Sequence, residues 1–463
     1  MLDFHQPTQV LRVGCGAGFS GDRTDAAGPV VQDLVAGLQA QGGHAVLIFE
    51  TLAERTLALA QLARRADPQA GYEPLLLDLL RPVLATCLAH GIRIVSNFGA
   101  ANPRAAAQAI AQLAHDLNLT APRIAVVWGD DVREHPEVQT LARSLPSPLV
   151  SANAYLGAQA IADALNQGAQ IVVCGRVADP ALTLGPALAH FGWALDDWNA
   201  IAGATMAGHL LECGAQVTGG YYADPGFKDL PDLAHVGFPI AQIEADGRCT
   251  LSKPAGTGGR IDAHTVKEQL LYEIDDPAAY VTPDVVADIT TAQVTELGPD
   301  RVQLSGVQGH PRPSHLKVNL CHENGWLAEA EISYAGARAQ ARARLAAQVV
   351  RERLPHLALR VDLIGVCSLW ADDAGEALAA LTDQGGTDVR LRMATSHADK
   401  TTAEQLLREV TALYTCGPAG GGGVRTALRP RLGLVSCLLP RQGIPCRFEM
   451  LPPLQPLPEG AAA

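Results

Sequence analysis

Short apolar runs alternate with Ala- and Leu-rich stretches from residue 11 to about residue 190, and polar, glycine-containing turns separate them. The apolar runs predict β-strands at 11–14, 44–50, 93–95, 123–128 and 171–174. The stretches between them predict helices over 51–65, 75–89 (kinked at Pro82) and 104–117. Strands that alternate with helices form βαβ units, so we expect an α/β domain over 1–199 whose sheet is mostly parallel, doubly wound and Rossmann-like.

The pattern changes after residue 199. Residues 200–289 are rich in Gly, Pro and polar side chains and lack a clear period, which predicts a loop-rich segment that closes the site. A second alternation over 290–450 predicts a smaller α+β domain, and 451–463 predict a disordered tail. In the smaller domain, strands are expected at 316–320, 327–334, 361–366 and 389–394, and helices at 338–354 and 402–413.

The composition of the 463 residues, with 48% hydrophobic and 18% charged side chains, is typical of a folded globular protein. The formal net charge of −13, without Lys/Arg clusters, disfavours binding to nucleic acid or to an anionic membrane. No apolar run is long enough to cross a bilayer and the first residues lack a secretory signal, so we expect a cytoplasmic location. The ten cysteines form no CxxC pair, which indicates reduced thiols rather than disulfides or a zinc cluster.

Polar side chains gather where the predicted parallel strands end, which is the edge at which open α/β sheets bind ligands. The candidates after these strand ends are Ser20, Asp22, Arg23, Glu50, Arg55, Asn97, Asn102, Arg176 and Asp179. Any single one of them could act only as a helix cap or in an internal ion pair. Because successive strand ends carry such residues, the pattern favours a binding site on this rim.

The segment 16–21 after the first strand fits the pattern GxGxxG, and Glu50 ends the next strand, where an acid could bind a ribose. No helix begins inside this segment, however, and Asp22 and Asp25 would repel the phosphates of a dinucleotide. A tight turn is therefore favoured over an NAD site. Asp130 and Asp131 could bind a divalent metal, but a solvated acidic turn is favoured, so the sequence requires no cofactor.

The residue types suggest roles for a reaction on an acid. Arginine binds carboxylate or phosphate groups through paired hydrogen bonds, so the candidates for holding an anionic substrate are Arg23, Arg55 and Arg176. The candidate bases are Asp22, Glu50 and Asp179, and the candidate acid is His209.

The Gly-rich parts of 200–289 are expected to fold over the rim and to exclude water from it. In that arrangement Tyr221, Asp224 and Lys253 approach the substrate and contribute to its binding. The alternative is that this segment forms an oligomer interface away from the rim.

Nine motifs spread along the chain carry a family resemblance. They are VGCGAGFSGDR (13–23), LAERTLA (52–58), NFGAANP (97–103), GRVADP (175–180), GHLLECG (208–214), TGGYYADPG (218–226), KPAGTGG (253–259), VKEQLLYE (266–273) and GPAGGGG (417–423). With them the chain resembles the acyclic terpene utilisation protein AtuA family. The resemblance implies a role in the breakdown of branched acids such as those from citronellol and geraniol, without an established reaction. Longer members carry a small C-terminal ferredoxin-like domain, which here is expected to be a separate subunit.

Three functional hypotheses follow. The first is a homo-oligomeric enzyme that acts on a branched or hydroxylated carboxylic acid, or on its CoA thioester, by a lyase or hydratase step. The second is a non-catalytic subunit that needs the small ferredoxin-like partner. The third is an NAD-linked oxidoreductase.

Overall fold

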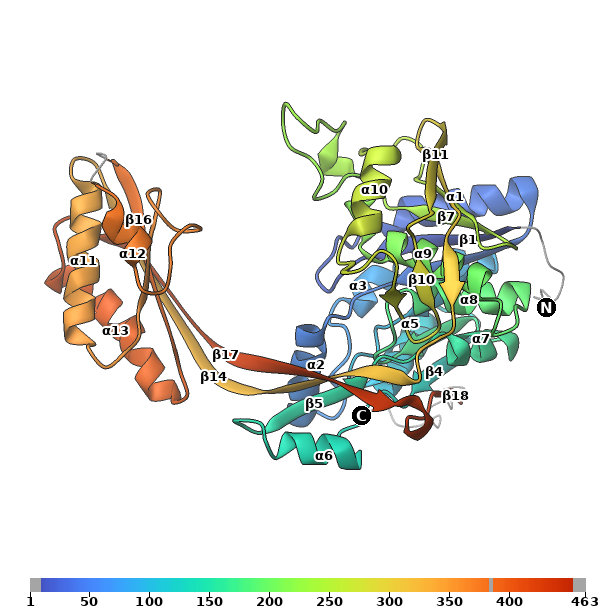
Figure 1. The fold of residues 1–463 in the computed structure, drawn as a ribbon, viewed down its shortest axis with the longest axis horizontal. Coiled ribbons are helices and arrows are strands. Elements are labelled where there is room, and N and C mark those ends of the chain that lie inside the picture. Colours follow the sequence, from blue (N-terminus) through green and yellow to red (C-terminus); the bar gives the residue numbers. More distant parts are fainter. Residues whose placement is uncertain (1–9, 383–385, 453–463) are drawn as a thin grey trace. The chain divides into compact units, whose positions relative to one another are not determined.

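The computed structural model describes residues 10–382 and 386–452, and its described residues form two compact units (Figure 1). The larger unit comprises residues up to Arg143, 150–321 and the residues from Val435 onward, and the smaller unit comprises 144–149 and 322–434. The chain enters the smaller unit within strand β14 (His315–Ala335) and leaves it within β17 (Gly422–Pro440). These divisions differ from the domain limits drawn from the sequence, because both strands continue from one unit into the other.

The fold is mixed α/β, and the larger unit contains a ten-stranded sheet in the order β11-β12-β8-β7-β1-β2-β3-β6-β4-β18. Its parallel centre consists of β1 (Val10–Ala17), β2 (His44–Phe49), β3 (Arg93–Ser96), β6 (Ile171–Cys174) and β4 (Ile124–Trp128). These are the five strands predicted for the first domain. Successive side chains of these strands are apolar and buried, so both faces of the strands are covered, as is typical of parallel strands.

Antiparallel strands extend this sheet on both sides, so it is mixed rather than mostly parallel. They are β7 (Ile240–Glu244), β8 (Cys249–Ser252), β12 (Arg301–Ser305) and β11 (Gln293–Gly298) on one side and β18 (Arg447–Met450) on the other. A small sheet joins β13 (Gln308–His310), β10 (Val286–Asp288) and β9 (Tyr280–Val281), and β5 (Leu149–Ala154) pairs with β14. A doubly wound, Rossmann-like arrangement stays a prediction.

The helices of the larger unit follow the predicted alternation. They are α1 (Ala27–Gln41), α2 (Glu54–Ala66), α3 (Leu76–Leu80), α4 (Leu84–Ala89), α5 (Pro103–Asp116), α6 (Pro136–Ala142), α7 (Gln159–Asn166), α8 (Ala181–Phe191), α9 (Trp198–Glu212) and α10 (Ala263–Leu271). The predicted helix over 75–89 is divided at Pro82 into α3 and α4, because proline removes a helical hydrogen bond.

Residues 200–289 contain more regular structure than the sequence indicated. Every residue of α9 from Ile201 to Glu212 is buried, so this helix has no polar face and shows no 3.6-residue period. Strands β7 and β8 also lie in this segment and pair with each other and with β1. The segment therefore holds α9, β7, β8 and α10 between its loops.

The smaller unit has the β-α-β-β-α-β order of ferredoxin-like folds. Its elements are β14, α11 (Ala339–Arg353), β15 (Arg360–Ile364), α12 (Glu376–Ala380), β16 (Asp388–His397), α13 (Lys400–Cys416) and β17. The sheet order is β15-β16-β14-β17, and α11 and α13 pack on β16 around one apolar core. The two strands predicted at 316–320 and 327–334 are one continuous strand, β14.

Two further expectations concern the ends and the surface of the chain. The predicted disordered tail over 451–463 lies, apart from Leu451 and Pro452, outside the described residues. None of the helices in 10–382 and 386–452 combines the length and the apolar character needed to cross a bilayer.

Candidate functional site

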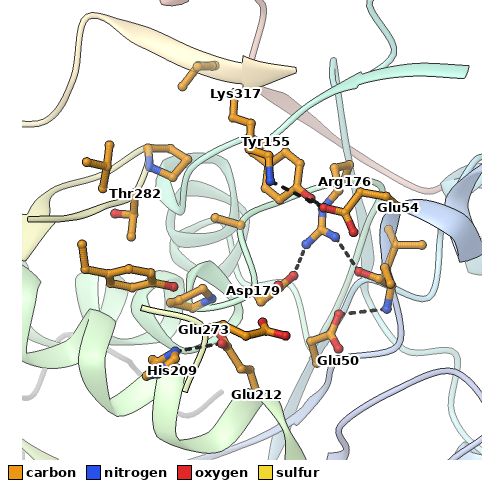
Figure 2. A pocket seen from close by; sticks show the side chains of 18 of the residues that line it. Glu50, Glu54, Tyr155, Arg176, Asp179, His209, Glu212, Glu273, Thr282 and Lys317 are labelled. Carbon is orange, nitrogen blue, oxygen red and sulfur yellow. Dashed lines mark hydrogen bonds and ion pairs between the residues drawn. The ribbon is translucent and has the colours of Figure 1, made fainter. Parts of the chain in front are cut away.

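A cavity of about 750 Å³ lies within the larger unit, where the predicted rim residues meet α9 and β14 (Figure 2). Its walls come from the ends of β1, β2 and β6, the start of α2, the C-terminal turn of α9, Glu273, residues 280–283 and the start of β14. The sequence-predicted residues that line it are Ser20, Glu50, Arg176, Asp179 and His209. The structure therefore brings together candidates from three strand ends and from helix α9.

Glu50 follows β2 and is almost fully buried. Its Oε1 atom accepts hydrogen bonds from the backbone N–H of Leu52 (2.8 Å) and from Nδ2 of Asn97 (2.7 Å). Burial, followed by the negative charge of Asp179, raises the pKa of Glu50 to about 8. Glu50 is therefore a carboxylic acid that keeps its proton near neutral pH.

Arg176 follows β6, and its side chain is only 2% exposed. The guanidinium donates to the carbonyl oxygens of Val177 (2.7 Å from Nε) and Leu52 (2.5 Å from NH1), and it forms an ion pair with Asp179. Its Cζ atom lies 4.4 Å from the centre of the Tyr155 ring. Most of its N–H groups are used inside the protein, so Arg176 mainly positions Asp179 and the surrounding backbone.

Asp130 holds the turn that carries Arg176. It is buried, and its Oδ2 accepts hydrogen bonds from the backbone N–H of Arg176 (2.9 Å) and from Nδ2 of Asn153 (2.8 Å). Burial raises the pKa of Asp130 to about 6. This aspartate therefore supports the turn after β6 from behind the cavity wall.

A polar network connects α2 with β14. Tyr155 donates its hydroxyl proton to Oε1 of Glu54 (2.5 Å), and Nδ2 of Asn319 donates to the same carboxylate oxygen (3.0 Å). The Lys317 amine lies 3.6 Å from Oε1 of Glu54 and 4.8 Å from the centre of the Tyr155 ring. Burial alone would raise the pKa of Glu54, but the Tyr155 hydrogen bond and the Lys317 charge lower it below its usual value. Glu54 is therefore ionised beside a half-exposed lysine.

His209 and Glu212 form a buried pair on the last turn of α9. The Nδ1 atom of His209 lies 2.9 Å from Oε1 of Glu212, and its Nε2 lies 3.0 Å from the carbonyl oxygen of Gln269. The carbonyl accepts the Nε2 proton, so one further proton occupies the Nδ1–Oε1 contact. Burial alone would lower the pKa of His209, but the Glu212 carboxylate raises it. The pair thus stores one proton at the cavity wall. Figure 2 shows His209 and Glu212 beside Glu273.

Three of the remaining sequence-predicted residues support the turns around the rim without lining the cavity. Asp22 accepts hydrogen bonds from the backbone N–H groups of Gly18 and Arg23 (2.8 Å each). Asn97 holds Glu50, and Asn102 caps α5 and donates to the carbonyl oxygens of residues 68 and 70.

The other predicted binding residues lie elsewhere in the described structure. Arg23 pairs with Asp25 at 2.9 Å, and Arg55 is exposed. Tyr221 is 90% exposed, Asp224 closes a turn with Lys228, and the amine of Lys253 donates to the carbonyl of Thr257. None of Arg23, Arg55, Tyr221, Asp224 and Lys253 lines the cavity. The segment 200–289 does contribute to the cavity, but through α9, Glu273 and residues 280–283 rather than through 219–226 and 253–259.

The glycine-rich segment 16–21 packs against protein atoms. A Cβ atom on Gly16 would lie 2.5 Å from the Phe49 ring, and one on Gly18 would lie 2.3 Å from the backbone nitrogen of Gly214. Helix α1 begins only at Ala27, so the helix that follows the segment in sequence does not begin inside it. Gly16 and Gly18 thus serve a close approach of backbone segments, and the Gly18 N–H donates to the Asp22 carboxylate. Among the described residues, no three His, Cys, Asp or Glu side chains are grouped closely enough to hold a metal ion.

The family model described as acyclic terpene utilisation family protein AtuA matches residues 11–450. The chain belongs to the AtuA family. The family description links it to acyclic terpene utilisation, a catabolic role. No curated protein matches the chain.

In this AtuA family member, sequence reasoning missed several residues that line the cavity: Tyr155, Glu273, Tyr280 and Lys317. Tyr155 and Lys317 come together because the backbone N–H of Tyr155 donates to the carbonyl of Lys317 (2.9 Å) across 162 positions of sequence. Glu273 has a positive φ of 58°, which no local pattern indicates for a glutamate. Only the motif VKEQLLYE, which ends at Glu273, gave any signal in the sequence.

Proposed function

We propose that the protein is a catabolic enzyme that acts on a branched or hydroxylated carboxylic acid, or on its CoA thioester, by lyase or hydratase chemistry. The observation that carries the proposal is the set of carboxyl groups in one cavity. Glu50 holds a proton near neutral pH, the His209–Glu212 pair stores another, and Asp179 forms an ion pair with Arg176. Figure 2 shows Asp179 beside Arg176, in the same cavity as Glu50 and the His209–Glu212 pair.

The elimination of water from a hydroxyacyl compound needs a base, an acid and a donor to the carbonyl oxygen. We assign the base to Asp179, which takes the proton from the carbon next to the carbonyl. The protonated carboxyl of Glu50 donates a hydrogen bond to the carbonyl oxygen as negative charge develops there. The His209–Glu212 pair gives its proton to the hydroxyl as the C–O bond breaks, so that water leaves and a C=C bond forms. The reverse sequence adds water.

The remaining walls suit a branched hydrocarbon chain. Apolar side chains of the cavity come from the start of α2, the turn after β6 and both β14 and β17, and include Leu52, Ala178, Pro180, Leu316 and Leu438. Each buried methylene of a ligand contributes about 0.8 kcal/mol of binding free energy. The cavity thus combines an apolar surface for a branched chain with acid and base groups for its functional end.

The test is the Asp179→Asn variant, which keeps the shape of the side chain and removes its basicity. The full-length protein is assayed by absorbance and mass spectrometry with a panel of branched 3-hydroxyacyl-CoA esters, their enoyl counterparts and the free acids. We expect turnover of a panel member by the wild type and a loss of about 10²–10⁴-fold in kcat for the variant. The matched control is Asp78→Asn, because Asp78 is exposed on α3 and outside the cavity.

Two results would count against the proposal. If the Asp179→Asn variant kept the wild-type kcat, Asp179 would not be the base. A folded wild-type chain that converts no member of the panel in either direction would refute lyase or hydratase chemistry on these substrates.

A further inference from the structure

Charge is distributed unevenly along the cavity. Its interior carries the carboxyl groups of Glu50, Asp179, Glu212 and Glu273, whereas the buried cation there, Arg176, already donates to protein acceptors. A free carboxylate of a substrate would meet this acidic surface without a strong partner. The interior therefore suits an uncharged reacting group, such as a thioester carbonyl and a hydroxyl.

The opening of the cavity has the opposite character. Ser314 and His315 are exposed and the Lys317 side chain is half exposed, so the cavity meets solvent at the start of β14. Arg312 is exposed two residues before Ser314. Basic side chains thus gather at one place in a chain whose net charge is −13.

Arg441 adds a second guanidinium to this opening. Its backbone N–H donates to the carbonyl of Ser314 (3.0 Å), and its NH2 group donates to the carbonyl of Pro283, and both of these residues line the cavity. Its Nε atom is buried and has no hydrogen-bond partner among the described residues. Arg441 therefore spans the two segments that frame the opening, next to the cavity-lining residues Ser314 and Pro283.

The two arginines at the opening lack a paired anion. Within the described residues, no carboxylate oxygen lies within 4.0 Å of the guanidinium of Arg312 or of Arg441. The nearby Asp284 is buried, and both of its oxygens accept the backbone N–H of Ala158. Burial, and then the charge of Arg312, lower the pKa of Arg441. The charge of Asp284 raises the pKa of Arg441 in turn, but one buried carboxylate does not balance two guanidinium groups, so the place favours an anionic ligand.

We infer that Arg312 and Arg441, together with Lys317, bind the phosphate groups of a coenzyme A thioester at the mouth of the cavity, so that the acyl part enters the acidic interior. This inference deepens the proposed function, on which it rests, by choosing the thioester over the free acid. Guanidinium groups bind phosphate through paired, charge-assisted hydrogen bonds, which are about twice as strong as neutral ones. The uncharged acyl end then meets Glu50 and Asp179 without a repulsive charge of its own.

Isothermal titration of the full-length protein with coenzyme A and with pantetheine, which lacks the nucleotide and its phosphates, tests the inference without any need for turnover. We expect coenzyme A to bind at least tenfold more tightly than pantetheine. We also expect Arg312→Gln and Arg441→Gln each to raise the Kd for coenzyme A about tenfold and to leave the Kd for pantetheine unchanged. Raising the salt concentration should weaken only the binding of coenzyme A.

Arg312→Gln is the safer variant, because Arg441 also holds the Pro283 carbonyl. The matched control is Arg81→Gln, which removes an exposed arginine of the same unit outside the cavity. Equal affinity for coenzyme A and pantetheine, or an unchanged Kd in Arg312→Gln, would overturn the inference. Turnover of a free acid without coenzyme A binding would also overturn it and would leave the proposed function standing. Coenzyme A binding without turnover of any ester would support the binding site and would count against the proposed function.

Discussion

Replacing Glu50 with glutamine probes the electrostatics of the cavity directly. Glu50 is buried, and burial with the charge of Asp179 raises its pKa from the usual 4.5 to about 8. The folded state therefore keeps a proton that the unfolded chain releases above pH 4.5. Glutamine keeps an oxygen that can accept the hydrogen bonds from Leu52 and Asn97 and carries no charge, so the Glu50→Gln variant is expected to fold.

The magnitude follows from the two pKa values. A difference of one unit between the folded and unfolded pKa corresponds to about 1.4 kcal/mol. The ionisation of Glu50 therefore costs the folded state on the order of 5 kcal/mol. Because the folded pKa lies above the unfolded pKa, the stability contributed by the bound proton is complete below pH 4.5. It is lost as the pH rises through about 8. Relative to the wild type, Glu50→Gln should therefore become more stable as the pH rises from 5 to 9.

The assay is the midpoint of thermal unfolding, measured for both proteins in matched buffers from pH 5 to pH 9. Glu54→Gln is the control, because Glu54 lies four residues away and behaves oppositely. Burial alone would raise the pKa of Glu54, but Tyr155 and Lys317 lower it, so removing its charge should cost stability by an amount that is constant above pH 6. Parallel curves for Glu50→Gln and the wild type from pH 5 to pH 9 would refute the reasoning.

Three further outcomes are expected. Arg176→Met leaves buried partners of the guanidinium without a donor and should cost about 3–5 kcal/mol in chemical denaturation, and a loss below 1 kcal/mol would contradict the positioning role. Gly18→Ala places a Cβ atom 2.3 Å from the backbone nitrogen of Gly214 and should lower the stability by about 1–3 kcal/mol. Its control, Gly28→Ala, meets open space in α1 and should raise the stability by about 0.5–1 kcal/mol. Equal unfolding midpoints for the two variants would show that the close approach at Gly18 is not required. Burial lowers the pKa of His44 to about 4, so the stability should fall as the pH drops from 6.5 to 4. In thermal unfolding, His44→Gln should lessen this dependence on pH. An unchanged slope of the melting temperature against pH would contradict the role of His44.

Much of the parallel sheet could be predicted from local pattern alone. The apolar runs that became β1, β2, β3, β4 and β6 are short, continuous and bounded by turn residues, which is the pattern of strands buried on both faces. Parallel strands end at one edge, so the positions of Glu50, Arg176 and Asp179 near a common cavity followed from the order of elements. The broken helix at Pro82 likewise followed from the chemistry of a single residue.

What the local pattern did not determine is which charged side chains turn inward. Arg23, Arg55 and Arg176 are the same residue type after predicted strands, but Arg23 finds Asp25 at the surface and Arg55 points to solvent. Only Arg176 is enclosed, because the carbonyl oxygens of Leu52 and Val177 and the Tyr155 ring surround it. Those partners come from three separate segments.

The tertiary structure also decided where the sequence carried no periodic signal. Helix α9 is buried along nearly its whole length, so its sequence lacks the polar face that reveals a helix, yet it supplies His209 and Glu212. Lys317 reaches the cavity only because β14 pairs with the chain at Tyr155, 162 positions earlier. The spacing of apolar residues indicates which face of an element is buried. Packing between segments that are distant in sequence determines which partner covers that face, and in this protein such packing assembled the cavity.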